Sequence, residues 1–466
     1  MRCLELSGPA PAMASYRYAT LDDLDMNSRE VVEDVEFSEV VPAVSAMRTS
    51  NKIREIVENL TSSKTSNEEG KEVISLSIGD PTTYGNLAVS EQARRAVADA
   101  VMSGLANGYA PSTGLKTARE AVAKYYTDPK KDLHVEPEDV ILTSGCSHAL
   151  QMTVTALVDP SRNQNILLPR PGFPLYQTIA EHVGVEIREY PLDPDRDWEV
   201  DLDALDDLID SKTAAVLINN PSNPCGSVYS ETHLEKIASI CRKRRVPIIA
   251  DEIYNGFCFT GLDSPWMGSL RVKTPIISVG GISKKYLVPG WRLGWLVIHD
   301  VGNALKKVRM GLERLATLIV GPNSIVQTAL PKILADVDEP WFQGVIGTLE
   351  DNANFVYERL KSIPGIKAVR PQGSMFMLVN VREVNPDDLI FARDCFDRQR
   401  IIVLPGTVFG VPGYVRITFS APRHVLMEAC DRLKEYCEET ISGETHGTGM
   451  DFSECSSLGS PAIVSS

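Results

Sequence analysis

The 466-residue chain lacks a surplus of basic charge, a long apolar run and a signal-like N-terminus. Its formal net charge of −15 argues against a nucleic-acid-binding protein, which normally carries a basic face. No apolar run approaches the roughly 20 residues that cross a bilayer. Residues 1–7 contain one cation and no apolar core, so they do not resemble a secretory signal. We therefore expect neither a nucleic-acid partner nor a membrane partner.

Paired cysteines are also missing. The nine cysteines are scattered, no two form a CxxC motif, and their total is odd. This pattern favours a reducing compartment and predicts neither a disulfide framework nor a metal site. We therefore expect a cytoplasmic protein.

The rest of the composition is that of an ordinary globular protein, with 43% hydrophobic and 23% charged residues. The length suffices for two or three domains that share large cores. Residues 1–44 predict an acidic, disordered arm, and residues 443–466 predict a disordered tail rich in Gly and Ser. Between them we expect a helix and extended segment over 45–85, a large domain over 86–335 and a small domain over 336–442.

Short β-branched runs alternate with amphipathic stretches through the middle of the chain. Because these runs are almost entirely apolar, they predict a mainly parallel α/β sheet covered on both faces. The runs lie at 140–143, 165–168, 214–218, 247–250, 275–278 and 293–298.

A smaller α/β domain is predicted further along the chain. A helical pattern at 323–335 closes the large domain, and helical patterns at 340–361 and 424–441 with strands near 374–381, 400–404 and 414–419 make up the smaller one. One helix over 46–62, with Ile53, Ile56, Val57 and Leu60, is expected to complete it from the N-terminal side.

The segment 281–295 follows an apolar run and places Lys284 eight positions before Arg292. An amine at the end of a buried strand can form a Schiff base with an aldehyde, and a guanidinium one loop later can clamp a phosphate. Pyridoxal 5′-phosphate carries both groups. The alternative is a basic loop whose cations are simply solvated.

Other segments with suitable chemistry lie at the ends of predicted strands, where doubly wound sheets bind ligands. Residues 143–150 end a strand and begin a helix, whose N–H groups and Ser147 hydroxyl either cradle a phosphate or form an ordinary capped start. Residues 219–226 contain two Asn-Pro units, so they form either a rigid turn alone or a turn that projects Asn223 toward a ligand.

Two further charged residues have both a functional and a structural interpretation. Asp251 ends an apolar strand, where a carboxylate is costly unless it is paired. It either pairs with a protonated pyridine nitrogen, with Tyr254 bonded to the phenolic oxygen of that ring, or it caps a helix or joins a structural ion pair. Arg416 lies in an alternating strand, which predicts either bidentate capture of a carboxylate or an exposed cation.

These residues complement one cofactor, and the chain over roughly 45–440 resembles the fold-type I, pyridoxal phosphate-dependent aminotransferases of class I/II, in their tyrosine-type branch. Beside the Lys284–Arg292 pair, the resemblance is carried by the stretches 75–82, 107–112, 169–173, 219–227, 250–254 and 287–295. It implies a large domain with a mainly parallel seven-stranded sheet flanked by helices, a smaller α/β domain, and a homodimer.

Carried over position by position, the resemblance makes Lys284 the Schiff-base lysine and gives catalytic roles to Asp251 and Tyr254 as well. It implies a cofactor-binding set of Gly145, Cys146, Ser147, Phe173, Asn223, Asp251, Tyr254, Ser283, Lys284, Arg292 and, from the neighbouring subunit, Tyr109. The substrate α-carboxylate would be held by Arg416, Asn223 and the backbone at Gly79. One position departs from the family, because Gly281 stands where many members have a phosphate-binding Ser. Whether Ser283 replaces it is open.

The implied reaction moves an amino group from L-tyrosine to the cofactor and then to 2-oxoglutarate, giving 4-hydroxyphenylpyruvate and L-glutamate. Phenylalanine is a second implied donor, and a role in the breakdown of both amino acids follows. Residues 315–322, where aspartate-specific relatives carry an Arg, are apolar apart from Thr317, although Arg314 lies beside them. The alternatives are a carbon–sulfur β-lyase, a broader aromatic or alanine-type aminotransferase, and a non-catalytic pyridoxal phosphate-binding regulator.

Overall fold

The computed structural model describes residues 40–61, 70–337 and 339–443, and the described residues from Val44 onward belong to one compact unit. Most of the expected acidic arm and of the expected tail therefore lies outside the described residues. The cysteines of the described part are free thiols, and none of its helices is long and apolar enough to cross a membrane. The cytoplasmic location and the domain boundaries stay predictions.

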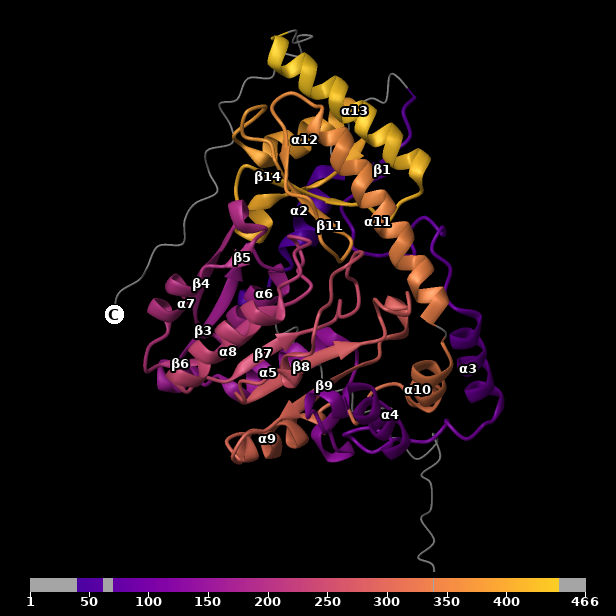
Figure 1. Ribbon diagram of the computed structural model, residues 1–466, viewed down its shortest axis with the longest axis vertical. Helices are drawn as coiled ribbons and strands as arrows, with labels where there is room; N and C mark the ends of the chain where they lie inside the picture. The colour runs from indigo at the N-terminus through magenta and orange to yellow at the C-terminus, as the bar shows by residue number, and fades with distance from the viewer. Residues whose placement is uncertain (1–39, 62–69, 338, 444–466) are drawn as a thin grey trace, which may run out of the picture. The chain divides into compact units, whose positions relative to one another are not determined.

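The large sheet has the order β2-β9-β8-β7-β6-β3-β4-β5 (Figure 1). Neighbours are parallel from β8 through β7, β6 and β3 to β4, and antiparallel at both ends of the sheet. The strands span Val140–Thr143 (β2), Asn165–Arg170 (β3), Glu186–Asp193 (β4), Glu199–Val200 (β5), Thr213–Asn219 (β6), Ile248–Asp251 (β7), Ile276–Gly281 (β8) and Gly294–His299 (β9).

The six strands expected from apolar runs are confirmed, but the sheet has eight strands where seven were expected. Strand β5 is only two residues long and pairs antiparallel with β4. Strand β4 is exposed or half-buried over much of its length, so its sequence is not the continuous apolar run that marks a strand covered on both faces.

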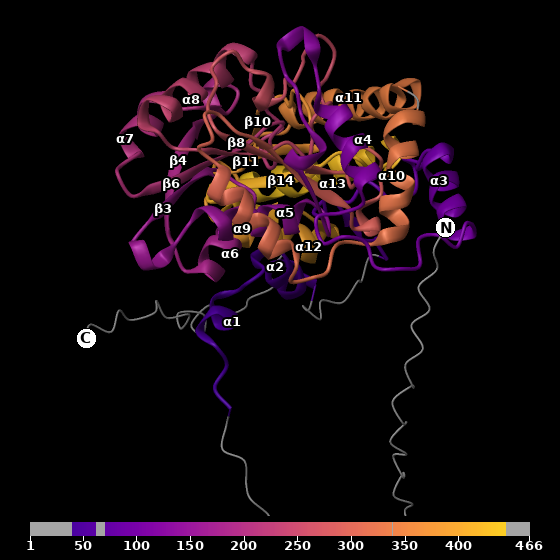
Figure 2. The ribbon, with the colours of Figure 1, turned by 90° about the horizontal axis from the view of Figure 1, so that it is seen from below.

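Helices cover both faces of the large sheet (Figures 1 and 2). Alternate strand residues pack against different helices, as Leu217 and Leu296 do on one face and Val216 and Val297 on the other. One face is covered by α5 (Cys146–Leu157), α6 (Pro174–Val183) and α9 (Lys306–Ala316). The other is covered by α7 (Leu202–Leu208), α8 (Glu231–Arg244), α4 (Lys116–Tyr126) and α10 (Ser324–Asp336), with α3 (Glu91–Met102) packed beyond α10.

A smaller antiparallel sheet has the order β10-β11-β14-β13 and packs against α11 (Glu339–Lys361), α12 (Asp388–Gln399) and α13 (Arg423–Ser442). Its strands are Lys367–Ala368 (β10), Phe376–Asn380 (β11), Tyr414–Thr418 (β14) and Leu404–Pro405 (β13). Beside it, β1 (Ile74–Ser75) pairs in parallel with β12 (Ile401–Ile402). The expected strand at 400–404 is thus two short strands, β12 and β13.

The single helix expected over 46–62 is two helices, α1 (Val44–Arg48) and α2 (Lys52–Thr61). The chain breaks at Asn51, whose side-chain oxygen accepts a hydrogen bond of 3.2 Å from the N–H of Arg54 and so starts α2. Ile53, Ile56 and Val57 pack against Leu404 of β13 and against Val408 and Phe409, which follow that strand.

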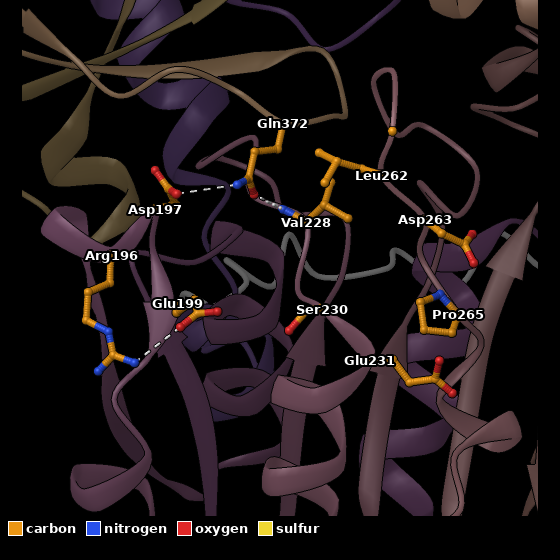
Figure 3. Close-up of a pocket in the computed structure, with 11 residues that line it drawn as sticks. Arg196, Asp197, Glu199, Val228, Ser230, Glu231, Leu262, Asp263, Pro265 and Gln372 are labelled. Carbon is orange, nitrogen blue, oxygen red and sulfur yellow. Dashed lines mark hydrogen bonds and ion pairs between the residues drawn. The ribbon is translucent and has the colours of Figure 1, made fainter.

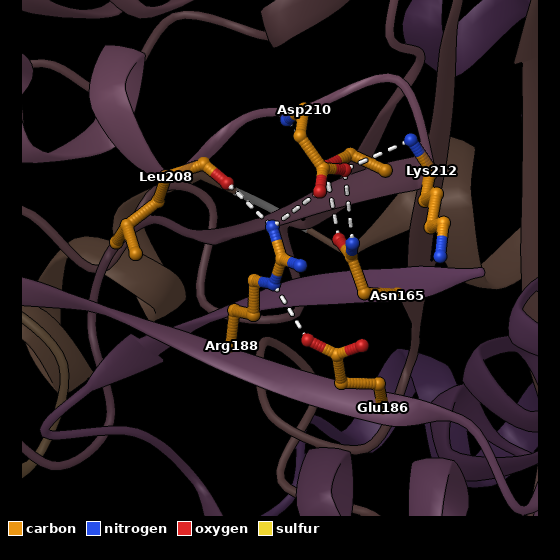
Figure 4. A network of polar contacts seen from close by, with 7 residues as sticks. Asn165, Glu186, Arg188, Leu208, Asp210 and Lys212 are labelled. Atoms are coloured by element: carbon orange, nitrogen blue, oxygen red, sulfur yellow. Dashed lines mark hydrogen bonds and ion pairs between the residues drawn. The ribbon is translucent and has the colours of Figure 1, made fainter. Parts of the chain in front are cut away.

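A polar network joins the amino-terminal ends of β3 and β6 to β4, at the edge of the sheet opposite the strand ends that carry the predicted site (Figure 4). Asp210 accepts hydrogen bonds from the Lys212 N–H at 2.8 Å, Asn165 at 3.1 Å and Arg188 at 2.8 Å. Desolvation raises the pKa of the Asp210 carboxyl, but these donors outweigh it and hold the pKa well below its usual range.

We expect Asp210→Asn to lower the thermal midpoint at pH 7 by a few degrees, because it removes the charge that three strands share. A depressed carboxyl pKa stabilises the fold above the ordinary value near 4 and ceases to do so as the pH falls. The deficit should therefore shrink below about pH 4, which thermal unfolding from pH 7 to pH 3 measures. Asp431→Asn, which removes an exposed ion pair with Arg359, is the control and should leave the midpoint nearly unchanged. Equal deficits at both pH values would contradict the prediction.

Candidate active site

A cavity of about 290 Å³ lies where strand ends of the large sheet meet residues of the small sheet. Ser77 to Gly79, which follow β1, and Ile53 of α2 also line it. The cavity brings together almost all of the residues that the sequence predicted for the site: Gly79, Cys146, Ser147, Phe173, Asn223, Asp251, Tyr254, Ser283, Lys284, Arg292 and Arg416.

Lys284 lies just after β8 and points its amine into the cavity. Its Nζ donates a hydrogen bond of 2.5 Å to the Gly79 carbonyl oxygen and lies 5.8 Å from the centre of the Tyr254 ring. Burial lowers the pKa of the Lys284 ammonium to about 8, Asp80 opposes that shift, and the cations Arg416 and Arg292 add to it. The amine therefore loses its proton much more readily than a surface lysine does.

The start of α5 and Arg292 form a cradle for an anion. Gly145 precedes the helix with φ at 85°, and a Cβ there would lie 2.5 Å from Arg292 Nη2. Only a glycine lets the guanidinium approach the free N–H groups of the helix start so closely. Within the described residues, Arg292 donates to the backbone carbonyls of Pro289 (2.9 Å) and Ser144 (3.2 Å) and forms no ion pair with a carboxylate.

The packing of the backbone explains why residue 281 is a glycine and not a serine. A Cβ at this position would lie 2.8 Å from the Leu293 carbonyl oxygen and 3.0 Å from Gly294 Cα, so the backbone of β9 occupies the space that a serine would need. Ser283, by contrast, is buried and lines the cavity.

Asp251 ends β7 with its carboxylate buried in the cavity wall. It accepts hydrogen bonds from Tyr176 Oη at 2.6 Å, from the Ile253 N–H at 3.2 Å and from Cys146 Sγ at 3.8 Å. All three donors are neutral, and burial raises the pKa of the Asp251 carboxyl. Sequence reasoning missed Tyr176, because its contact spans 75 positions and no local pattern marks it. It also missed Asn219, which donates to the Asp251 carbonyl and accepts from the Asn223 N–H.

Arg416 is a buried cation, only 2% exposed, with no acidic partner in the described part of the chain. Its Nη1 donates to Asn223 Oδ1 at 2.9 Å, its Nη2 donates to the Ser77 carbonyl, and its Nε has no partner among the residues that the structure describes. The guanidinium lies against the rings of Phe376 and Phe409, at 4.3 and 4.8 Å. Burial lowers the pKa of Arg416 to about 9. An anionic ligand in the cavity would supply the missing counter-charge.

These features fit pyridoxal phosphate. The Lys284 amine, with its lowered pKa, can react with the aldehyde of the cofactor. The start of α5 together with Arg292 suits its phosphate, and the buried Asp251 suits its cationic ring nitrogen. The unpaired Arg416 remains for the carboxylate of a substrate.

Three predicted features do not line this cavity. Gly145 lies next to its lining residue Cys146, just before α5. Tyr109 is 94% exposed, and its role toward another subunit stays a prediction. The stretch 315–322 also stays away from the cavity, and Leu318 within it is 77% exposed.

A second concave region, of about 500 Å³, lies near Gln372 and lacks any predicted site residue (Figure 3). Gln372 donates to Asp197 at 3.5 Å and accepts from the Val228 N–H at 2.9 Å, while Arg196 pairs with Glu199 at 3.3 Å. Its charged groups are largely exposed, so it lacks the buried, unpaired cation that marks the first cavity.

Comparison with known proteins agrees with the geometry. The family model for aminotransferase class I and II matches residues 71–433. Tyrosine aminotransferase from Mus musculus is 44% identical over 405 residues, which cover 86% of this chain and 88% of that protein. S-alkyl-thiohydroximate lyase from Arabidopsis thaliana is 35% identical, over 79% of this chain and 80% of that protein. The crystal structure of tyrosine aminotransferase from Leishmania infantum matches with a TM-score of 0.81 and 35% identity, covering 87% of this chain and 99% of that one.

With a family match over most of its length and a cavity that suits the cofactor, the chain belongs to the class I and II aminotransferases, which are pyridoxal 5′-phosphate-dependent enzymes.

Proposed function

We propose that this aminotransferase takes the amino group of L-tyrosine and passes it to 2-oxoglutarate, giving 4-hydroxyphenylpyruvate and L-glutamate. The observation that carries the proposal is that one cavity holds both the Lys284 amine and Arg416, a cation without a counter-ion among the described residues. An α-amino acid offers its carboxylate to Arg416 and its reacting α-carbon to Lys284. The 44% identity to tyrosine aminotransferase and the apolar wall formed by Ile53, Ile78 and Phe173 support an aromatic donor.

Arg416 and Asn223 act together on the substrate carboxylate in this proposal. Asn223 Oδ1 holds one guanidinium nitrogen, so the fork is oriented before substrate arrives. The packing of Phe376 and Phe409 on the guanidinium excludes water and strengthens its attraction for an anion.

Lys284 is the proposed acid–base group. The cofactor, when bound, supplies an aldehyde and a ring that withdraws electrons from the substrate α-carbon. Lys284 Nζ then takes the proton from that carbon and returns it to the cofactor side, for which a pKa near neutrality is suited. Asp251 would hold the positive charge of the ring nitrogen, and Tyr176 keeps that carboxylate oriented.

A homodimer completes the proposal, with Tyr109 reaching the phosphate in the partner's site. The supporting observation is a group of exposed apolar side chains in the segments 101–109 and 318–320. The two segments lie near each other, because Ser324 Oγ donates a hydrogen bond of 2.6 Å to the Ala106 carbonyl. These side chains are Val101, Met102, Leu105, Tyr109, Leu318, Ile319 and Val320. An apolar patch of this kind favours burial against a second copy.

A carbon–sulfur β-lyase is the competing function, because the Arabidopsis lyase is 35% identical over most of both chains. The holoenzyme should lose the visible band of its bound cofactor when L-tyrosine is added and recover it with 2-oxoglutarate. Release of pyruvate and a thiol from a cystathionine-like substrate, without recovery by 2-oxoglutarate, would favour the lyase instead. A protein whose spectrum responds to neither substrate would support the regulator.

Lys284→Ala should abolish turnover yet still bind the cofactor non-covalently, because only the reacting amine is lost. Lys285→Ala is a matched control, since Lys285 packs over the Phe342 ring at 4.8 Å and does not line the cavity. Turnover assays and spectral titration separate the two variants. Substantial single-turnover exchange by Lys284→Ala, with no added amine, would refute the assignment of the base.

Tyr109→Ala should weaken cofactor binding about tenfold through loss of one phosphate contact. Mixing this variant with Lys284→Ala forms heterodimers in which one site has both native residues, so part of the lost affinity and turnover should return. The measurement is cofactor titration and turnover before and after subunit exchange, with sedimentation to establish the dimer. A monomer, or a mixture no better than either variant, would overturn the shared site.

A further inference from the structure

The segment 77–80, which follows β1, is bonded to two cations of the 290 Å³ cavity, called the reaction cavity below. The Ser77 carbonyl accepts from Arg416 Nη2, and the Gly79 carbonyl accepts from Lys284 Nζ at 2.5 Å. Asp80 comes next in the chain and is half-buried. Bond lengths alone therefore place the carboxyl carbon of Asp80 within about 8 Å of Lys284 Nζ. The covalent chain itself fixes a carboxylate near the reacting amine.

The turn after Asp80 holds its carboxylate in one orientation. Asp80 Oδ1 accepts hydrogen bonds from the Thr82 N–H at 2.8 Å and from Thr82 Oγ1 at 2.7 Å, and the Asp80 carbonyl accepts from Thr83 Oγ1 at 3.0 Å. Such turns bind an Asp side chain to its own backbone. These donors are neutral, and Asp80 forms no direct ion pair within residues 40–61, 70–337 and 339–443. Its negative charge is therefore not neutralised by an adjacent cation.

The charges that face the Lys284 amine are mainly positive or already assigned. The titratable and charged groups around it are Arg416 on β14, Arg292 before β9, the Cys146 thiol on α5, Asp251 on β7, the Tyr254 ring and Asp80. Burial is the main cause of the lowered pKa of Lys284, and Asp80 is the strongest of the charges that act on it. Because Asp251 serves the ring nitrogen in the proposed function, Asp80 is the carboxylate left to balance the amine.

We propose that Asp80 is a positioning residue for the proton transfer, whose carboxylate stabilises the protonated Lys284 amine and so sets the pH at which that amine can act as the base. Neutral Lys284 Nζ takes the proton from the substrate α-carbon and becomes an ammonium group, which Asp80 stabilises until the proton is returned. A base works best when its proton affinity is matched to the working pH, since it must be both unprotonated and strong. This inference rests on the proposed function.

The first test titrates the holoenzyme without substrate. The visible band of the bound cofactor changes with pH as Lys284 Nζ loses its proton. Asp80→Asn should move the midpoint of that change about one pH unit lower, because one negative charge near the amine is removed. Asparagine keeps the oxygen that accepts from Thr82, so the turn is retained and the charge alone is lost.

Asp159→Asn is the matched control. Asp159, Pro160 and Ser161 form the same kind of turn, in which Asp159 Oδ1 accepts from the Ser161 N–H at 3.0 Å and from Ser161 Oγ at 2.6 Å. This turn follows the end of α5 that is opposite to the reaction cavity, about 18 Å along the helix. The control variant should therefore leave the spectral midpoint unchanged.

The pH dependence of kcat with L-tyrosine gives the second readout. Asp80→Asn should move the acid limb of the kcat profile about one pH unit lower and reduce the plateau several-fold, because a weaker base takes the proton more slowly. The KM for L-tyrosine should stay nearly unchanged, because Arg416 and Asn223 are intact. Asp80→Glu, which keeps the charge, should return part of both shifts.

An unchanged spectral midpoint in Asp80→Asn, or an equal shift in Asp159→Asn, would overturn the role of Asp80. So would a loss of turnover in Asp80→Asn with neither midpoint moved, because the residue would then only shape its turn. The spectral titration uses no substrate. A holoenzyme that titrates as expected but does not react with L-tyrosine would overturn the proposed function instead, so the two failures are distinguishable.

Discussion

The geometry of the reaction cavity depends on one close contact, between the start of α5 and strand β9. A Cβ at Gly294 would lie 2.5 Å from the Gly145 carbonyl carbon and 2.6 Å from the Cys146 nitrogen, so the helix can begin there only because that side chain is a hydrogen. Arg292 precedes β9 and Lys284 follows β8, and these two strands are direct neighbours. The anion cradle and the reactive amine are therefore positioned by the same pair of strands.

Around that contact the fold buries charged groups whose hydrogen-bond partners, among the described residues, are all neutral. Asp251 is bonded by neutral donors, Arg416 by an amide and a carbonyl, and the Lys284 amine by a carbonyl. Each arrangement satisfies some hydrogen bonds but compensates the charge only at longer range, as Asp80 does for Lys284, which costs stability. A ligand with a cationic ring nitrogen and a carboxylate offsets that cost on binding, so the unfavourable burial becomes affinity for the ligand.

The two sheets contribute different parts of this ligand environment. The large sheet supplies Asp251 and Lys284 at its strand ends, whereas the small sheet supplies Phe376 and Arg416. The segment after β1, which pairs with β12 beside the small sheet, brings Ile78 and Gly79 to the same space. The cavity is therefore lined by residues of both parts of the fold, while the proposed anion cradle belongs to the large sheet alone.

Much of this fold follows from local patterns in the sequence. Continuous apolar runs predicted six strands of the large sheet, because a strand covered on both faces has no solvent side to mark with polar residues. The same reasoning missed β4, which is partly exposed. It also read one helix where Asn51 starts a second, because a cap inside an otherwise helical pattern competes with the apolar periodicity.

The sequence by itself determined which chemical groups this protein carries and which predicted strands hold or precede them, since both depend on neighbouring residues. Lys284, Asp251, Asn223 and Arg416 could be named on that basis, with the resemblance to a family assigning their roles. Only the tertiary structure decided that Tyr176 holds Asp251 and that the backbone of Leu293 and Gly294 excludes a serine at 281. These are contacts between segments far apart in the chain, and no local pattern encodes them, because the distance between two such segments is set by the packing of the whole fold.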